Sequence, residues 1–210
     1  MYRRVLLISL VLSSFFSHAQ EQDSIYDTPT KYDYLYATVS SGSLDSDIGE
    51  NSNVTTWNLG GNGLVTEHWL VAVDYSARFV NLKSTDLRID TLLAGGGYRF
   101  ELTGDLDLVT VAQVGAIKAK ETLESIDKTL YSESEFVYAG SLYLNYAFTE
   151  KTEGRLAAEF NRSDWIDENI TRLEVNHYIT PVIALGGFYT YRKANSHYSN
   201  EAGVSFRVLY

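Results

Sequence analysis

The side chains of this chain best suited to transfer protons near neutral pH are its carboxylates and four histidines, and the chain has no cysteine. His197 lies just before the last predicted strand, and Asp164 and Asp167 lie in a connection predicted to reach the same end of the fold. A histidine and two carboxylates at that end could act as general acid and base in the hydrolysis of a lipid or a peptide. No spacing rule separates this group from three exposed polar residues. We therefore predict that the chain is not an enzyme, and we keep a hydrolase at this end as the third alternative.

A second acidic group, Asp45, Asp47 and Glu50, has the spacing of part of a calcium-binding loop. The other ligands of that loop and its two flanking helices are not found in the sequence around it. We therefore predict no metal site and no cofactor for this chain.

The largest group of charged and amide side chains occupies every second position of successive short segments. In residues 69–79, for example, Asp74 and Arg78 alternate with Val73 and Tyr75. Side chains of a β-strand point alternately to its two faces, so these polar residues share one face. The group holds six arginines and five carboxylates, a balance that lets charges enclosed in a narrow barrel pair with one another. The residues that we predict to face the interior are Asp74, Arg78, Arg99, Glu135, Asn145, Arg155, Glu159, Asn161, Arg172, Glu174, Asn176, Arg192, Glu201 and Arg207.

Ten segments carry this period-two pattern, and they are the elements that must position the charged face. Most of them have the roughly 9 to 11 residues that a tilted membrane-spanning strand needs. Their connections tend to alternate between short and long, which is typical of a barrel with turns at one end and loops at the other. We predict an all-β fold, a closed antiparallel up-and-down barrel of ten strands, with eight as the alternative count. The predicted strands are residues 32–41, 53–63, 70–80, 87–100, 106–119, 134–148, 153–163, 170–179, 182–192 and 200–210.

The N-terminal residues predict export. Residues 1–19 have the three parts of a secretory signal peptide: two arginines, an apolar run and a small-residue end at Ala19. Residues 20–31 are polar and aperiodic, so we predict a flexible periplasmic lead before a barrel domain of residues 32–210. Removal of the signal peptide leaves 15 basic against 27 acidic residues, a balance that disfavours nucleic acid as a partner.

The uncharged face of the predicted strands matches the outside of a barrel in a lipid bilayer. We find no lysine or arginine on it, where either would cost about 2–4 kcal/mol at the bilayer midplane. Trp69 and Phe79 are separated by roughly 25 Å of height, at a rise of about 3.3 Å per residue and a tilt near 40°. That separation is the expected height of the apolar band between two aromatic girdles. Residues 32–41 and 106–119 can be phased either way. The predicted girdle residues are Trp69, Phe79, Tyr98, Phe100, Phe136, Tyr138, Tyr146, Phe148, Phe160, Tyr189, Tyr191, Phe206 and Tyr210.

At residues 93–100 (Leu-Ala-Gly-Gly-Gly-Tyr-Arg-Phe) and 203–210 (Gly-Val-Ser-Phe-Arg-Val-Leu-Tyr) the chain resembles the small outer-membrane β-barrel proteins of Gram-negative bacteria. This broad group includes the OmpA transmembrane domain and OmpX. The resemblance implies a monomer in the outer membrane, in contact with membrane lipid and lipopolysaccharide. The residues Phe206, Val208 and Tyr210 look like the C-terminal signal that the barrel-assembly machinery recognises, with Ser205 where that signal often has glycine.

These patterns predict an integral outer-membrane barrel with a filled or narrow polar lumen, acidic extracellular loops and a structural or surface-contact role. A narrow porin-like channel for small solutes is the second hypothesis, ranked lower because small barrels are about wide enough for their own side chains. Alternation alone does not show which face is outside, so a soluble ten-stranded barrel is the alternative fold. The signal peptide, the girdle spacing and the terminal aromatic residue favour the membrane.

Overall fold

The computed structural model describes residues 28–44, 53–82, 85–123 and 128–210. The predicted signal peptide, residues 1–19, and residues 20–27 of the predicted lead lie outside the described residues. In the described part of the chain every regular element is a β-strand, and no helix there is long and apolar enough to cross a membrane.

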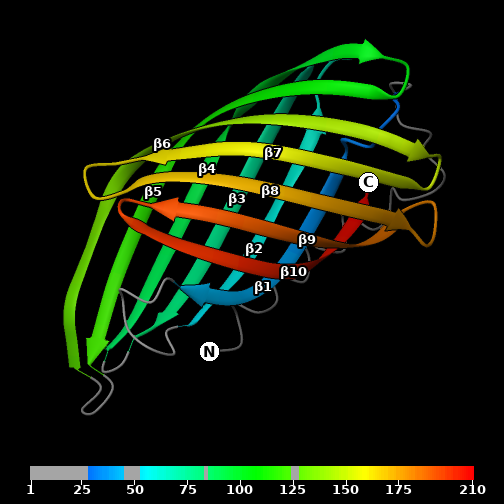
Figure 1. Ribbon diagram of the computed structural model, residues 1–210. Helices are drawn as coiled ribbons and strands as arrows, with labels where there is room; N and C mark the ends of the chain where they lie inside the picture. Colours follow the sequence, from blue (N-terminus) through cyan, green and yellow to red (C-terminus); the bar gives the residue numbers. More distant parts are fainter. Residues whose placement is uncertain (1–27, 45–52, 83–84, 124–127) are drawn as a thin grey trace, which may run out of the picture.

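Ten strands close into one antiparallel barrel, in which strands adjacent in the sequence are hydrogen-bonded and β1 is hydrogen-bonded to β10 (Figure 1). The prediction of a ten-stranded up-and-down barrel is confirmed, and the alternative count of eight is wrong. The strands are β1 (Tyr34–Leu44), β2 (Asn53–Leu64), β3 (Trp69–Asn81), β4 (Thr85–Thr103), β5 (Leu106–Leu123), β6 (Lys128–Thr149), β7 (Thr152–Arg162), β8 (Asp167–Tyr178), β9 (Ile183–Ala194) and β10 (His197–Leu209).

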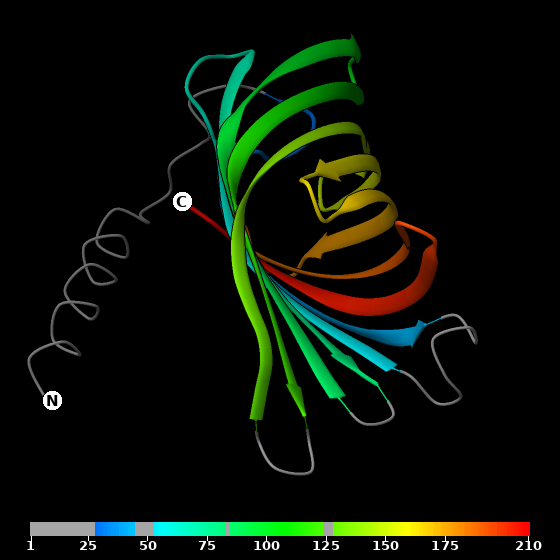
Figure 2. The same cartoon turned by 90° about the vertical axis from the view of Figure 1, so that its left-hand side faces the viewer.

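Strands β4, β5 and β6 are longer than predicted, with 19, 18 and 22 residues. Most of residues 120–133, which separate two predicted strands, belong to β5 and β6, and Glu121 is paired with Tyr131 in their ladder. Polar residues on both faces hid this extension, because no apolar face marks it in the sequence. In Figure 2 the ends of β5 and β6 project beyond the other strands.

The two ends of the barrel differ in their connections. Tyr210 follows β10 at what we call the turn end, which carries residues 65–68, 104–105, 150–151 and 179–182. The opposite end, the loop end, carries residues 45–52, 82–84, 124–127, 163–166 and 195–196. Residues 193–199 lie between two predicted strands, but in the structure only residues 195 and 196 are outside the strands. These two residues form a hairpin turn in which Asn195 has a φ of 52°. Asparagine tolerates this left-handed conformation, so a tight turn replaces the expected loop.

The interior of the barrel has two different walls. The inward residues of β7 to β10 form what we call the ionic wall, because most of the buried charges come from it. The inward residues of β3 to β6 form what we call the apolar wall, although Arg78, Arg99 and Asp107 are also buried on these strands. Its buried apolar members are Leu70, Ala72, Val80, Leu93, Val109, Val111, Ile117, Val137 and Ala139.

The two strands that the sequence left without a phase are now assigned. β1 turns Tyr34, Thr38 and Ser40 inward, so Leu35 faces out. β5 turns Val109, Val111 and Ile117 inward, and these residues pack into the apolar wall. Apolar residues occur at both parities of β5 because one face of the strand packs inside the barrel and the other belongs to the apolar outer face.

The outer face exposes large apolar side chains on each of the ten strands. Of the predicted girdle residues, Phe79 and Tyr98 are half-buried and the others are exposed. The prediction of an outer face without lysine or arginine is wrong near the loop end, where Arg88 and Lys118 point outward beside Asp90. Strands β4 and β5 extend beyond the apolar band at the loop end, and their outward side chains beyond the band are polar or charged.

Candidate functional site: the charged lumen

Two arginines and two glutamates, Arg78, Glu168, Arg192 and Glu201, form what we call the loop-end cluster. Arg192 Nη1 lies 2.7 Å from Glu168 Oε1, and Arg192 Nε lies 3.5 Å from Glu201 Oε1. Arg78 lies 3.4 Å from the same oxygen of Glu201 and 3.7 Å from Glu168. All four side chains are buried, and Glu201 also accepts a hydrogen bond of 2.8 Å from the hydroxyl of Thr56. The cluster is electrically neutral, as burial of charge requires.

The loop-end cluster crosses the lumen from wall to wall. Arg78 lies on β3 and Glu168 lies on β8, and these two strands stand directly opposite each other in the ten-strand order. A pair of buried ions that reaches from one strand to the opposite strand leaves little room for a continuous passage. Both ions keep a partner, so the lumen is obstructed here without an unpaired buried charge.

A second group of charges, the turn-end cluster, contains Arg99, Asp107, Glu153, Glu174 and Arg207. Arg207 donates hydrogen bonds of 2.5 Å to Glu153 and 2.9 Å to Glu174. Arg99 donates a hydrogen bond of 2.8 Å from Nε to Asp107 Oδ2, and neither of these two side chains is exposed. The cluster therefore holds three buried ionic contacts in two groups on different sides of the lumen, one group on β4 and β5 and the other on β7, β8 and β10.

Near the turn end, Tyr34 on β1 contacts two arginines of the ionic wall. Arg155 on β7 donates a hydrogen bond of 2.9 Å to the hydroxyl of Tyr34 on β1. The guanidinium of Arg207 lies over the ring of Tyr34, 4.5 Å from its centroid. Cation–π contacts of this kind stabilise a desolvated arginine without using another carboxylate.

The residues just before β1 close the turn end. Tyr32 is 3% exposed, its hydroxyl donates to Asp107 at 2.8 Å, and it accepts from Asn145 at 3.1 Å. Burial and then the negative charge of Asp107 raise the pKa of Tyr32, so its hydroxyl stays a neutral donor. The backbone nitrogen of Lys31 donates to Glu153 at 3.2 Å, and Thr28 and Thr30 are buried. Residues 28–31, assigned by the sequence to a flexible lead, are instead packed against the barrel.

At the loop end, the connection between β7 and β8 lies against the apolar wall. Trp165 and Ile166 pack against the buried cluster of Leu93, Ile117, Val137 and Ala139. The ring of Trp165 also lies edge-on to the ring of Tyr131, with centroids 6.1 Å apart. Both ends of the lumen therefore carry residues from outside the regular strands.

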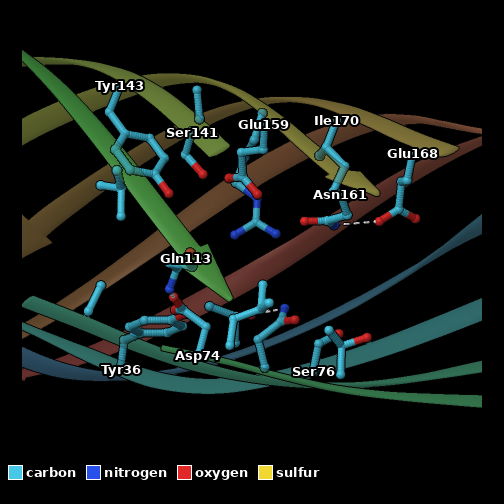
Figure 3. Close-up of a pocket in the computed structure, with 18 of the residues that line it drawn as sticks. Tyr36, Asp74, Ser76, Gln113, Ser141, Tyr143, Glu159, Asn161, Glu168 and Ile170 are labelled. Carbon is cyan, nitrogen blue, oxygen red and sulfur yellow. Dashed lines mark hydrogen bonds between the residues drawn. The ribbon is translucent and has the colours of Figure 1, made fainter. Parts of the chain in front are cut away.

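Between the two clusters lies a cavity of about 140 Å³, shown in close-up in Figure 3. On one side Asp74 accepts hydrogen bonds from the hydroxyl of Tyr36 and, at 2.6 Å, from Gln113. On the other side Glu159 makes no hydrogen bond or salt bridge to any described residue, and Arg172 donates only to Thr190, at 3.2 Å. An apolar cavity of about 150 Å³ stays dry, whereas a polar one of this size holds several ordered waters. Asp74 is therefore held by direct hydrogen bonds, whereas Glu159 and Arg172 border a polar cavity that is large enough for water.

Comparison of this chain with known proteins shows which class of folds it is similar to. No protein-family model and no curated protein matches the chain. Among solved structures, the translocator domain of the autotransporter NalP from Neisseria meningitidis is similar, with a TM-score of 0.50, 9% identity and coverage of 99% of this chain and 96% of that chain. The chain has the fold of an outer-membrane β-barrel.

Two further outer-membrane barrels resemble the chain over most of their length. Neisserial surface protein A has a TM-score of 0.47 and 16% identity, and covers 84% of this chain and 96% of that chain. The attachment invasion locus protein Ail of Yersinia pestis has a TM-score of 0.37 and 12% identity, with coverage of 84% and 99%. At these identities the likeness concerns the fold, and the lumen of this outer-membrane barrel must be interpreted from its own residues.

The structure places every predicted lumen-facing residue on the inner side of the barrel wall. Most are buried or line the central cavity, and Glu135 is half-buried with one carboxylate oxygen enclosed. Three carboxylates of the two clusters, Asp107, Glu153 and Glu168, were missed by the sequence-based prediction. Each lies at or close to the end of a predicted strand. Each also points to the same face of its strand as the inward residue two positions later, which is Val109, Arg155 and Ile170 respectively. For Glu153 and Glu168 that parity is the signal that could have found them, whereas Asp107 lies in a segment that the sequence left without a phase.

The residues considered for catalysis lie at the loop end. Asp167 lies 3.1 Å from Arg162 in a salt bridge, and Asp164 and His197 are exposed. In the described ranges no group of three or more His, Cys, Asp or Glu side chains could hold a metal ion. In the predicted assembly signal, Phe206 and Tyr210 are exposed, Val208 is half-buried, and the hydroxyl of Tyr210 donates to the carbonyl of Asn62 at 2.9 Å.

Proposed function

We propose that the protein is an integral outer-membrane barrel with a closed lumen, and that it acts as a structural or surface-contact protein rather than as a channel or an enzyme. The observation that carries this proposal is the salt bridge between Arg78 and Glu168, which joins opposite strands within a neutral buried cluster. The packed residues at the two ends of the lumen, Tyr32 and Trp165, support it. Barrels of about this size are generally filled by their own side chains.

The orientation follows from the connections. Short turns face the periplasm in outer-membrane barrels, so the turn end would lie there and the loop end would face outward. The predicted signal peptide would direct export, and the strand ending in Tyr210 would be read by the assembly machinery. The protein would insert as a monomer in contact with outer-membrane lipid and lipopolysaccharide, with its acidic loops as the contact surface and without nucleic acid as a partner.

Conductance in a planar lipid bilayer tests the closed lumen. We expect no steady current steps from the wild-type protein. Replacement of both partners, Arg78→Ser with Glu168→Ser, removes the bridge between opposite strands and is expected to produce small steps. The control is Lys193→Ser, which changes an exposed residue of β9 and is expected to leave the protein silent.

A narrow channel is the second candidate, and the central cavity favours it, because Glu159 and Arg172 are left to hydrating water there. If the wild-type protein conducts steadily, and if the steps vanish when Arg78 or Glu159 is replaced by a bulky apolar residue, the channel is the correct function and the closed barrel is wrong.

A further inference from the structure

Two lysines stand on the outer face of β5 near the loop end. Lys118 and Lys120 are exposed, and neither makes a hydrogen bond or salt bridge to a described residue. In the ladder with β4, Lys118 is opposite Asp90 and Lys120 is opposite Arg88. Two outward lysines on a barrel whose formal net charge is −10 are not explained by a requirement of the fold.

The carboxylates of the same face do not neutralise these lysines. Asp90 accepts hydrogen bonds from Arg88 at 2.8 Å and 3.1 Å and from the hydroxyl of Tyr75 at 2.6 Å. The other outward carboxylate, Asp86, is opposite Thr122, one row closer to the loop end than Lys120. Asp90 interacts with both Arg88 and Lys118, so three outward positive charges face two outward carboxylates and the patch keeps a net positive charge for a ligand.

The height of the lysines matches the headgroup region of a bilayer. The girdle residue Phe136 is opposite Ala116, so Lys118 and Lys120 lie two and four residues beyond the girdle along β5. At a rise of about 3.3 Å per residue and a tilt near 40°, they stand roughly 5 and 10 Å above it. The headgroup region on each side of a bilayer is about 5–8 Å thick, so the lysine side chains lie within and just above it.

An apolar hollow lies on the outer face below the lysines. It has a volume of about 890 Å³ and extends over β4 to β8. Small residues form its floor, and at Gly140 an added Cβ would come within 2.3 Å of the Phe160 ring, which lies across it. Val114 borders the hollow and precedes Lys118 by four residues on the same face of β5, about 13 Å along the strand. The outward residues that shape the hollow are Ala112, Val114, Tyr138, Gly140, Ala158 and Phe160.

We propose that this face is a binding site for one phosphorylated lipid of the outer leaflet, of the lipopolysaccharide type. Lys118 and Lys120 bind its phosphate groups, and one of its acyl chains lies in the hollow over β4 to β8. The lysines supply the charge and the hollow supplies apolar contact area that a phosphate ion cannot use. The inference rests on the proposed function, because it requires the loop end to face the outer leaflet.

The test is lipid binding to the full-length protein in detergent, measured by native mass spectrometry with bis-phosphorylated lipid A as the probe. The variant Lys118→Gln with Lys120→Gln is expected to weaken binding about 30-fold, or about fivefold for each lysine at an anionic lipid surface. The control, Lys151→Gln, removes an exposed lysine at the turn end, away from the hollow, and is expected to bind as wild type. Ala112→Leu, which fills the hollow, is expected to weaken binding while leaving the salt dependence unchanged.

Four results would overturn the proposal. They are equal binding by the lysine variant, equal loss in the control, equal binding of dephosphorylated lipid A, and displacement of lipid A by millimolar inorganic phosphate. A stable dimer in lipid-free detergent that Ala112→Leu dissociates would assign the hollow to a second copy of the chain. Cell fractionation separates failure of the lipid-binding proposal from failure of the proposed function. A protein that is recovered from cells only with detergent remains a membrane barrel, whichever lipid it binds.

Discussion

The apolar wall and the ionic wall use the same antiparallel ladder, but different forces hold their inward side chains together. On the apolar wall Val109, Ile117 and Val137 are buried against other apolar side chains. On the ionic wall Arg192 and Arg207 are buried against carboxylates. Dispersion and burial stabilise the first, whereas the second depends on each charge keeping its partner.

The difference shows how the two sides of a small barrel contribute to filling its lumen. The apolar wall supplies bulk that fills one side, and the ionic wall supplies long side chains that reach across the remaining space. Arg78, which stands on β3 among apolar neighbours, joins the two walls through Glu168 and Glu201. The free energy of unfolding should therefore respond differently in the two walls to single substitutions, to salt and to a second substitution that removes the partner charge.

Loss of a carboxylate from the loop-end cluster is the largest expected effect. Glu201→Leu leaves Arg78 and Arg192 with one buried carboxylate between them, and we expect the free energy of unfolding to fall by about 3–5 kcal/mol. Urea-induced unfolding in lipid vesicles measures this. The double variant Glu201→Leu with Arg78→Met should recover more than half of the loss. If the single variant loses less than about 1 kcal/mol, the buried pairing is not what stabilises the ionic wall.

Removal of a large side chain from the apolar wall ranks second. Ile117→Ala leaves a cavity beneath Leu93 and Val137, and we expect the free energy of unfolding to fall by about 3 kcal/mol. The loss should be the same at low and high salt, because no charge is involved. A salt-dependent loss would contradict the division of the interior into two kinds of wall.

Opening the turn end ranks third. Tyr32→Phe removes a hydroxyl shared by Asp107 and Asn145, and we expect a loss of about 1–2 kcal/mol in the free energy of unfolding. The control is Tyr131→Phe, which removes an exposed hydroxyl that donates to Glu133 and should leave the stability unchanged. Equal effects of the two variants would show that residue 32 does not close the barrel.

The salt bridge between Arg162 and Asp167 at the loop end is expected to contribute least. Both side chains are partly exposed, at 27% and 65%, and lie outside the enclosed clusters. We expect Asp167→Asn to cost no more than about 1 kcal/mol in low salt and nothing measurable in about 1 M salt. A loss comparable with that of Glu201→Leu would remove the distinction between enclosed and exposed charges.

The parity of the sequence predicts most of the ionic wall. A residue such as Arg155 or Glu174 on a short alternating segment has one face to occupy, because exposure of its charge to lipid is costly. The carboxylates Asp107, Glu153 and Glu168 were missed because they lie at or next to the ends of predicted strands, where alternation is too short to be recognised. Their partners are set by closure of the barrel, which brings strands distant in the sequence together.

The apolar wall could not be predicted, because hydropathy does not distinguish lipid from protein interior. Val111 and Val114 on β5 look alike in the sequence, yet the first is buried in the lumen and the second is 54% exposed. The packing of Tyr32 and Trp165 was missed for a related reason. Both lie outside regular alternation, and only the closed barrel provides the surfaces against which they pack.

Collision accessibility of a nitroxide spin label on two adjacent residues of β6 tests the central claim most directly. Ser141 lines the central cavity and Leu142 is 45% exposed on the outer face. In lipid vesicles, a label at Leu142→Cys should be reached by oxygen and not by a water-soluble nickel complex. A label at Ser141→Cys should be shielded from both if the lumen is closed, as we propose. Free access of the nickel complex to the label at residue 141 would show an open lumen and contradict the account.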